Sequence, residues 1–150
     1  METVFPGLHA MQNVHPLLVH FPIAFWLAAL LFEIFSAVRS NEDWHRNAAR
    51  FLYLGTVFGI AAAITGWLAQ KLVPPSGDAH AVLETHETLM LVALTASGWL
   101  SLIALLRPRL SSAQQKWFLA GLVVLALLTV FGSDRGAELV YRYATSVRLP

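Results

Sequence analysis

Apolar residues gather into four long runs along the chain, and short polar stretches separate them. The runs predict membrane-spanning helices at about residues 17–38, 48–69, 84–106 and 115–133. Each is close to the roughly 20 residues that an α-helix needs to cross the hydrocarbon core of a bilayer. The predicted fold is therefore an all-α integral membrane four-helix bundle. It forms a single transmembrane domain over residues 1–150, with a short C-terminal tail at 134–150.

The connecting segments indicate how the bundle is oriented. The first and third connectors, 39–47 and 107–115, contain two arginines each, whereas the second, 71–78, contains one lysine and two prolines. Loops rich in lysine and arginine stay on the cytoplasmic side of a membrane. An even number of spans puts both termini on the opposite side. We therefore expect a multi-pass membrane protein with both termini on the outer side.

The composition agrees with a membrane protein and excludes several other classes. The chain is 57% hydrophobic and 13% charged, against roughly 45–50% and about 25% in soluble proteins. Its net charge of +1 gives no basic surface for nucleic acid. The absence of cysteine excludes disulfides, thiolate metal sites, cysteine-ligated iron–sulfur clusters and thioether-linked haem.

Histidine is the strongest chemical signal in the chain. Five of the six histidines fall on the predicted outer side, in two clusters that each precede or begin an apolar run: His9, His15, His20, His80 and His86. Neutral imidazole is the commonest protein ligand for iron, copper and zinc. The clusters therefore indicate a metal or haem site near the outer face of the membrane.

The spacing of these histidines favours one deep ligand from each helix. Neither His15 with His20 nor His80 with His86 has the i,i+4 spacing of a two-histidine zinc site on one helix. His20 and His86 would instead meet at similar depth, as axial ligation of a haem between facing helices requires. We expect His20 and His86 to bind the metal. His15 and His80 are then reserve ligands or hydrogen-bond donors to the haem propionates.

A simpler interpretation exists for each of these residues. A histidine near the membrane surface can be an ordinary polar residue among the headgroups, and this is the interpretation that we favour for His9 and His80. Glu84 and Glu87, which flank His86, are either solvated at the interface or orient an imidazole from behind.

Two polar residues are predicted on the inner side. Glu33 lies within the first span, where an acidic residue is by default a functional-site hypothesis. Because Arg39 follows closely in the sequence, we favour an ion pair between the two, or a Glu33 side chain that extends to the inner interface. His45 is interpreted as an ordinary loop residue.

One stretch of the chain resembles a known family. The residues from His15 to Ala24, His-Pro-Leu-Leu-Val-His-Phe-Pro-Ile-Ala, are similar to the opening signature of a bacterial membrane family catalogued as domain of unknown function 2231. Weaker similarities at 65–67, 83–87 and 136–142 extend the match to about residues 13–147. The resemblance implies a four-helix integral membrane protein related to b-type haem membrane cytochromes. Since the family is bacterial, it also implies a multi-pass protein of the bacterial inner membrane, whose outer side is periplasmic. In some relatives this membrane domain is joined to a redox domain, which favours a role in electron transfer.

The resemblance also implies which residues matter. His15, His20 and His86 match histidine positions of the family pattern, which implies that they are functional residues. The chain departs from the family pattern at Tyr143, where a histidine is expected. Tyrosine can ligate haem iron, but we favour a lost ligand or a supporting contact with the cofactor at this position.

The leading functional hypothesis combines these observations. The protein is expected to be a b-type cytochrome-like electron-transfer protein that binds haem b near the outer membrane face. It would pass single electrons between a quinol or periplasmic carrier and a partner redox protein or larger membrane complex. An electron-transfer protein or subunit is favoured over a stand-alone enzyme, and no catalytic residue is assigned.

Two alternatives stay open. The first is a haem-free copper- or zinc-binding membrane protein, with the outer histidines as nitrogen ligands and Glu84 or Glu87 as a carboxylate ligand. The second is a structural accessory subunit of a respiratory or photosynthetic complex. Gly55, Gly59 and Ala63 would matter most there, because small residues at this spacing let helices approach closely in lipid. The same small residues could instead leave room for a flat cofactor.

Overall fold

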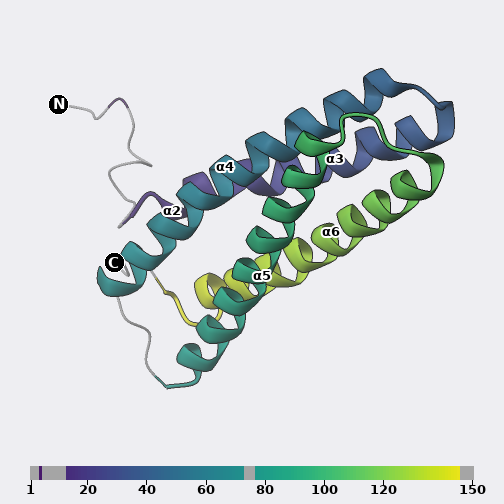
Figure 1. Cartoon of the computed structure of the whole chain (residues 1–150). Helices are drawn as coiled ribbons and strands as arrows, with labels where there is room; N and C mark the ends of the chain where they lie inside the picture. Colours follow the sequence, from purple (N-terminus) through teal and green to yellow (C-terminus); the bar gives the residue numbers. More distant parts are fainter. Residues whose placement is uncertain (1–3, 5–12, 73–76, 146–150) are drawn as a thin grey trace.

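The computed structural model describes Val4, residues 13–72 and residues 77–145, and every regular element in these ranges is an α-helix. The elements are α2 (His15–Leu18), α3 (His20–Arg39), α4 (Glu42–Leu72), α5 (Asp78–Leu106) and α6 (Ser112–Tyr141) (Figure 1). Four stretches are long and apolar enough to cross a membrane: His15–Arg39, Glu42–Lys71, Asp78–Leu106 and Ser112–Tyr141. The predicted all-α fold with four such helices is confirmed for the described residues.

The helices are longer than the predicted spans, because polar residues continue the backbone hydrogen bonding at their ends. This is clearest in α6, which runs on to Tyr141 although we expected a separate tail from residue 134. Glu138 stabilises the extension by accepting hydrogen bonds from Arg135 at 2.5 Å and from Arg142 at 2.9 Å. The apolar pattern therefore locates the part of α6 that crosses the membrane rather than its ends.

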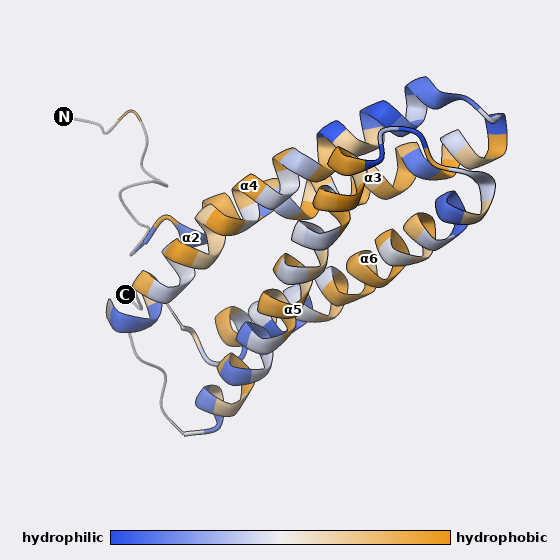
Figure 2. Ribbon diagram, viewed as in Figure 1, coloured by the Kyte–Doolittle hydropathy of each residue, from blue (hydrophilic) through white to orange (hydrophobic). Residues whose placement is uncertain are grey.

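The four long helices form a ring of two hairpins. α3 packs against α4 and α6, and α5 packs against the same two helices. The α3–α4 and α5–α6 connections lie together at one end of the bundle, which we call the loop end (Figure 1). The starts of α3 and α5 and the ends of α4 and α6 lie at the opposite, terminal end. Figure 2 shows polar residues concentrated at these two ends and apolar residues along the flanks between them.

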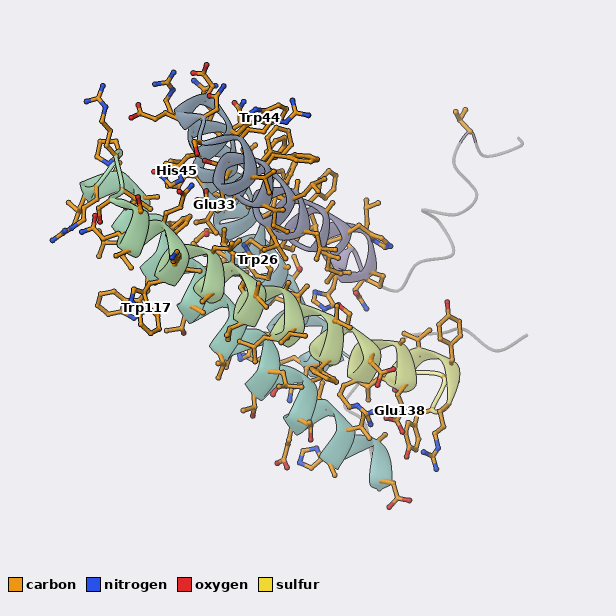
Figure 3. All side chains as sticks on the ribbon, turned by 90° about the vertical axis from the view of Figure 1, so that its right-hand side faces the viewer. Trp26, Glu33, Trp44, His45, Trp117 and Glu138 are labelled. Atoms are coloured by element: carbon orange, nitrogen blue, oxygen red, sulfur yellow. The ribbon has the colours of Figure 1, made fainter. Side chains whose placement is uncertain are left out.

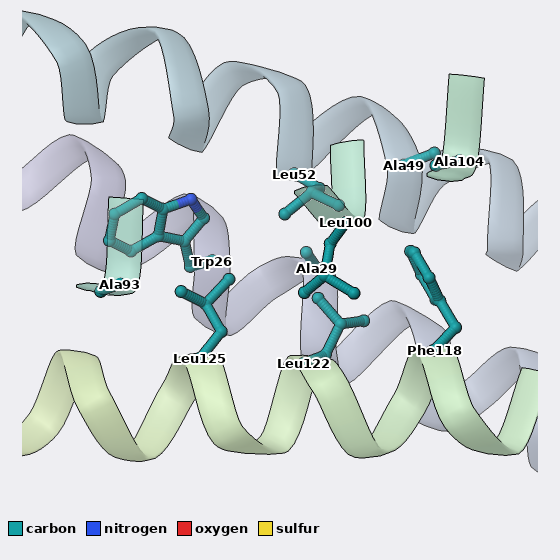
Figure 4. Close-up of a cluster of buried hydrophobic side chains, with 10 residues drawn as sticks. All are labelled: Trp26, Ala29, Ala49, Leu52, Ala93, Leu100, Ala104, Phe118, Leu122 and Leu125. Atoms are coloured by element: carbon teal, nitrogen blue, oxygen red, sulfur yellow. The ribbon is translucent and has the colours of Figure 1, made fainter. Parts of the chain in front are cut away.

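Small residues bring the helices together at the centre of the bundle. Ala29 and Ala93 are completely buried, and the Trp26 indole lies against Gly55 and Gly59 of α4. A Cβ added to Gly55 would lie 2.6 Å from Trp26 Nε1, so the glycine makes room for the ring. The buried cluster is drawn in Figure 4 and consists of Trp26, Ala29, Ala49, Leu52, Ala93, Leu100, Ala104, Phe118, Leu122 and Leu125. Gly55 and Gly59 thus serve packing within the bundle.

The outward faces of the helices carry large apolar side chains. Val57 of α4, Leu105 of α5 and Phe131 of α6 are 63%, 67% and 61% exposed. Apolar side chains on this scale are unfavourable in water but are well solvated by lipid tails. The faces around the ring are therefore suited to contact with the bilayer.

Candidate functional site

His15 is held against the second helix of its own hairpin. Its ring atom Nδ1 donates to the backbone carbonyl of Ala62 at 3.0 Å and lies 3.3 Å from the Thr65 hydroxyl oxygen. The local sequence prepares this position, since the Asn13 side chain accepts the backbone N–H of His15 at 3.1 Å and Pro16 follows in the first turn of α2. A carbonyl oxygen can only accept, so Nδ1 carries a proton, and in the neutral ring Nε2 then presents a lone pair.

His86 is held in the same way in the other hairpin. Its Nδ1 donates to the backbone carbonyl of Gly132 at 2.7 Å, and the ring is half-buried between α5 and α6. By the same reasoning Nδ1 carries a proton, and in the neutral ring Nε2 presents a lone pair. Within the described part of the chain, Nε2 of neither ring takes part in a hydrogen bond.

A glycine lies against each imidazole. A Cβ on Gly66 would be 2.9 Å from His15 Cε1, and a Cβ on Gly136 would be 3.0 Å from His86 Cε1. Each glycine follows the carbonyl that its histidine binds by four residues, which is about one helical turn. Both hairpins therefore use one arrangement, in which the second helix supplies a carbonyl for Nδ1 and a glycine that leaves room for the ring.

The two arrangements lie at the same, terminal end of the bundle, with His15 in α2 and His86 in the third turn of α5. They belong to different hairpins, whose helices α4 and α5 are in contact. Each hairpin thus holds one imidazole at this end through Nδ1, and neither Nε2 has a hydrogen-bond partner among the described residues.

The other predicted site residues lie outside this pair. The His20 side chain is exposed at the start of α3. His80 is exposed, with Nε2 3.4 Å from the Glu84 carboxylate on the next turn. Tyr143 is half-buried beyond the end of α6, and its ring centroid lies 5.4 Å from the Arg142 guanidinium carbon. His9 lies outside the described residues.

No cluster of three or more metal-binding side chains forms in the ranges that the structure describes. Glu84 is exposed and Glu87 is half-buried, and neither contacts the His15–His86 pair by a described hydrogen bond. A nitrogen-rich copper or zinc site from the outer histidines and a carboxylate is therefore not assembled among these residues.

Our interpretation of the two inner polar residues is wrong. Glu33 does not pair with Arg39; its carboxylate accepts a hydrogen bond from His45 Nδ1 at 2.7 Å. His45 is not an ordinary loop residue, because it lies in α4 and is only 6% exposed. The reason is that the α3–α4 connection is short: Ser40 turns the chain with a left-handed φ of 50°, and α4 begins at Glu42. The first turn of α4 then faces α3.

Comparison with known proteins agrees with this fold. The family model described as "Predicted membrane protein (DUF2231)" matches residues 11–148, which is most of the chain. No curated protein and no solved structure matches the chain. The matched range includes both histidines of the pair and the glycine against each of them. The chain therefore belongs to this family of membrane proteins.

Proposed function

We propose that His15 and His86 are the axial ligands of a b-type haem bound between the two hairpins. One observation carries the proposal: Nδ1 of His15 donates to the Ala62 carbonyl at 3.0 Å and Nδ1 of His86 donates to the Gly132 carbonyl at 2.7 Å, while neither Nε2 has a hydrogen-bond partner among the described residues. Histidines that ligate metals almost always donate their other ring nitrogen to a carbonyl or carboxylate, which fixes the tautomer and the orientation of the ring.

The number of ligands favours haem over a free metal ion. A porphyrin supplies four nitrogens to the iron and leaves two axial positions, so that a pair of imidazoles completes the site. A structural zinc site needs four protein ligands and a catalytic one needs three, and no such group forms among the described residues. Haem iron therefore fits the donor set better than copper or zinc does.

The choice of His15 revises the ligand pair expected from spacing. His20 is exposed, and its side chain forms no hydrogen bond with a described residue, whereas His15 is half-buried and its ring is hydrogen-bonded to α4. His20 is the alternative ligand, and a comparison of His15→Ala with His20→Ala distinguishes the two. His80 and Tyr143 lie at the same end of the bundle and are proposed as polar contacts for the haem propionates.

The proposed function is one-electron transfer at the outer face of a bacterial inner membrane. When bound, the haem supplies a reversible iron couple. The chain holds the two imidazoles and surrounds them with apolar helices, and this low-polarity environment sets the potential. The electron donor would be a quinol or periplasmic carrier, and the acceptor a partner redox protein.

The accessory-subunit hypothesis is less favoured. It relied on the small residues of α4 as a surface for a neighbouring helix. Gly55 and Gly59 are covered by Trp26 from the same chain, so they do not offer that surface to another subunit.

The proposal is tested by the absorption spectrum of the detergent-purified protein after expression with added haem. We expect a Soret band and a low-spin spectrum with one haem per chain, quantified as the pyridine haemochrome. His15→Ala and His86→Ala should each lose the low-spin spectrum. His20→Ala should keep it, and so should Thr95→Val, a control at an exposed residue whose hydroxyl donates to the Leu91 carbonyl in α5.

Two results would overturn the proposal at different levels. Wild-type protein without a Soret band would rule out the haem. Loss of the low-spin spectrum in His20→Ala, with retention in His15→Ala, would show that the ligand pair is the one expected from spacing.

A further inference from the structure

The loop end contains a second buried polar group, at the other end of the bundle from the histidine pair. Glu33 of α3 is completely buried, and Figure 3 shows it beside His45 of α4. Besides the hydrogen bond from His45, the Glu33 carboxylate accepts one from the Gln115 amide nitrogen at 3.1 Å. The same nitrogen lies 2.9 Å from Ser36 Oγ, and this hydroxyl donates to the Asn41 carbonyl at 3.1 Å. Three helices thus meet at one carboxylate.

One atom of this group has no partner. His45 Nε2 is buried and forms no hydrogen bond within the part of the chain that the structure describes. If the imidazole is protonated, this atom is an N–H group without an acceptor. If the imidazole is neutral with its proton on Nδ1, the atom is a lone pair without a donor. Buried polar atoms are nearly always satisfied, so that an exception calls for bound water, an ion or a functional role.

A pocket reaches this group from the loop end. Its volume is about 180 Å³, and its lining includes His45, Ser36 and Gln115 together with Asn41 and Arg109 from the two connections. Each water molecule takes up about 30 Å³ in the liquid, and a polar cavity of this size is normally hydrated. The pocket therefore gives water at the loop end a route to the His45 side chain.

Besides Glu33, few charged groups among the described residues lie near His45. The charged residues that line the pocket are Glu42 of α4 and Arg109 of the α5–α6 connection. They pair with each other at 3.4 Å and are 62% and 80% exposed, so water screens them. From α6, the neighbours are the neutral Gln115 and the Phe118 ring, whose centroid is 5.4 Å from that of His45. The buried Glu33 carboxylate is the charged group in direct contact with the imidazole.

We propose that the Glu33–His45 pair is a proton-binding site that exchanges protons with the solution at the loop end through this pocket. Imidazole is the side chain that changes charge most readily between pH 5 and 8. A carboxylate in contact stabilises the imidazolium form. A hydrated proton that reaches the pocket binds the imidazole and leaves a water molecule, and the resulting cation is paired with the Glu33 carboxylate. Release follows the same route in reverse.

The site is independent of the proposed haem, since no residue is shared between the two. It also has a direction, because the pocket opens at one end of the bundle only among the described residues. If the first and third connectors face the cytoplasm, as the arginine distribution predicts, the protons exchanged are cytoplasmic.

The test is a pH titration of the full chain in detergent, with the histidine Cε1 carbons labelled with ¹³C. The His45 resonance is assigned by its loss in His45→Gln. We expect this resonance to move with pH as the imidazole binds and releases its proton. Its midpoint should shift to lower pH in Glu33→Gln, because the imidazolium loses its partner. Glu42→Gln is the matched control at the pocket rim and should leave the midpoint unchanged.

A second variant tests the route. Ser112 lines the pocket and is exposed, so Ser112→Trp should fill the opening and slow the exchange between the two forms, which broadens the His45 resonance. A His45 resonance that stays constant over the whole range in the wild type would overturn the proposal, and this measurement does not depend on any variant folding. An unchanged midpoint in a folded Glu33→Gln protein would also overturn it.

Discussion

The imidazole of His86 lies directly against Gly136, where an added Cβ would come within 3.0 Å of ring atom Cε1. The glycine is one helical turn from Gly132, whose carbonyl holds the ring by Nδ1 at 2.7 Å. A single turn of α6 therefore fixes both the direction and the depth of the imidazole. The acceptor is backbone, so most side-chain substitutions around the ring would leave this hydrogen bond in place.

Gly136→Ala should displace the His86 ring and weaken haem binding, and Gly66→Ala should do the same through His15. Loss of a supporting contact typically lowers metal affinity by about tenfold or more. The measurement is a haem titration of the purified protein followed at the Soret band. Gly98→Ala is the matched control, because a Cβ there meets no atom within 4 Å. Wild-type affinity in both test variants would contradict the role given to these glycines.

Gly55→Ala should destabilise the bundle itself. The new methyl group would lie 2.6 Å from Trp26 Nε1 in a fully packed region. Overpacking of this kind costs about 1–3 kcal/mol. Unfolding in detergent with increasing SDS, followed by circular dichroism, measures the loss. Gly98→Ala should leave stability unchanged or raise it slightly, since alanine favours a helix over glycine. Equal stability of the two variants would show that the indole can move away freely.

The hydrogen bond between Thr56 of α4 and Ser101 of α5, at 3.0 Å, should stabilise the contact between the two hairpins. A double-mutant cycle of Thr56→Val and Ser101→Ala should give a coupling energy of about 0.6 kcal/mol, as is typical between membrane helices. Thr95→Val is a control, because its exposed hydroxyl bonds only within α5. A coupling energy of zero would show that the two hydroxyls find other partners when one is removed.

Glu138→Gln should loosen the end of α6 and leave the rest of the bundle intact. The charged carboxylate accepts hydrogen bonds from both Arg135 and Arg142, and the amide of glutamine binds cations far more weakly. Backbone hydrogen exchange measured by mass spectrometry should increase in peptides that cover residues 136–142 and stay unchanged in peptides from the centre of α6. Protection equal to the wild type would show that the backbone alone holds these last turns.

The membrane-crossing part of the fold follows from the sequence, because only long apolar runs can lie in lipid. The ends of the helices do not follow from hydropathy. At the end of α6 the residues are polar, and the helix continues because Glu138 pairs with two arginines within one turn on either side. The beginning of α4 depends on a single left-handed residue, Ser40, which the sequence pattern does not single out.

The candidate site was only partly accessible to sequence reasoning. The spacing along the sequence predicts His86 with His20, whereas the contacts of the rings lead us to propose His86 with His15. The contacts that distinguish the two lie 47 residues away, at the Ala62 carbonyl, and periodicity along one helix carries no information about them. The Glu33–His45 pair does not follow from the sequence either, because Arg39 is the opposite charge close to Glu33 in the chain and His45 reaches Glu33 only through the left-handed turn at Ser40.

The repeated carbonyl–glycine arrangement has a mechanical consequence. Each imidazole is hydrogen-bonded within its own hairpin, His15 to α4 and His86 to α6. No described hydrogen bond joins the two rings to each other. The separation of the two Nε2 atoms is therefore set by how the hairpins pack, mainly where α4 meets α5 and α3 meets α6. Sliding or tilting one hairpin against the other would change the gap between the rings without breaking either hydrogen bond. The interface between the two hairpins therefore determines the distance between the imidazoles.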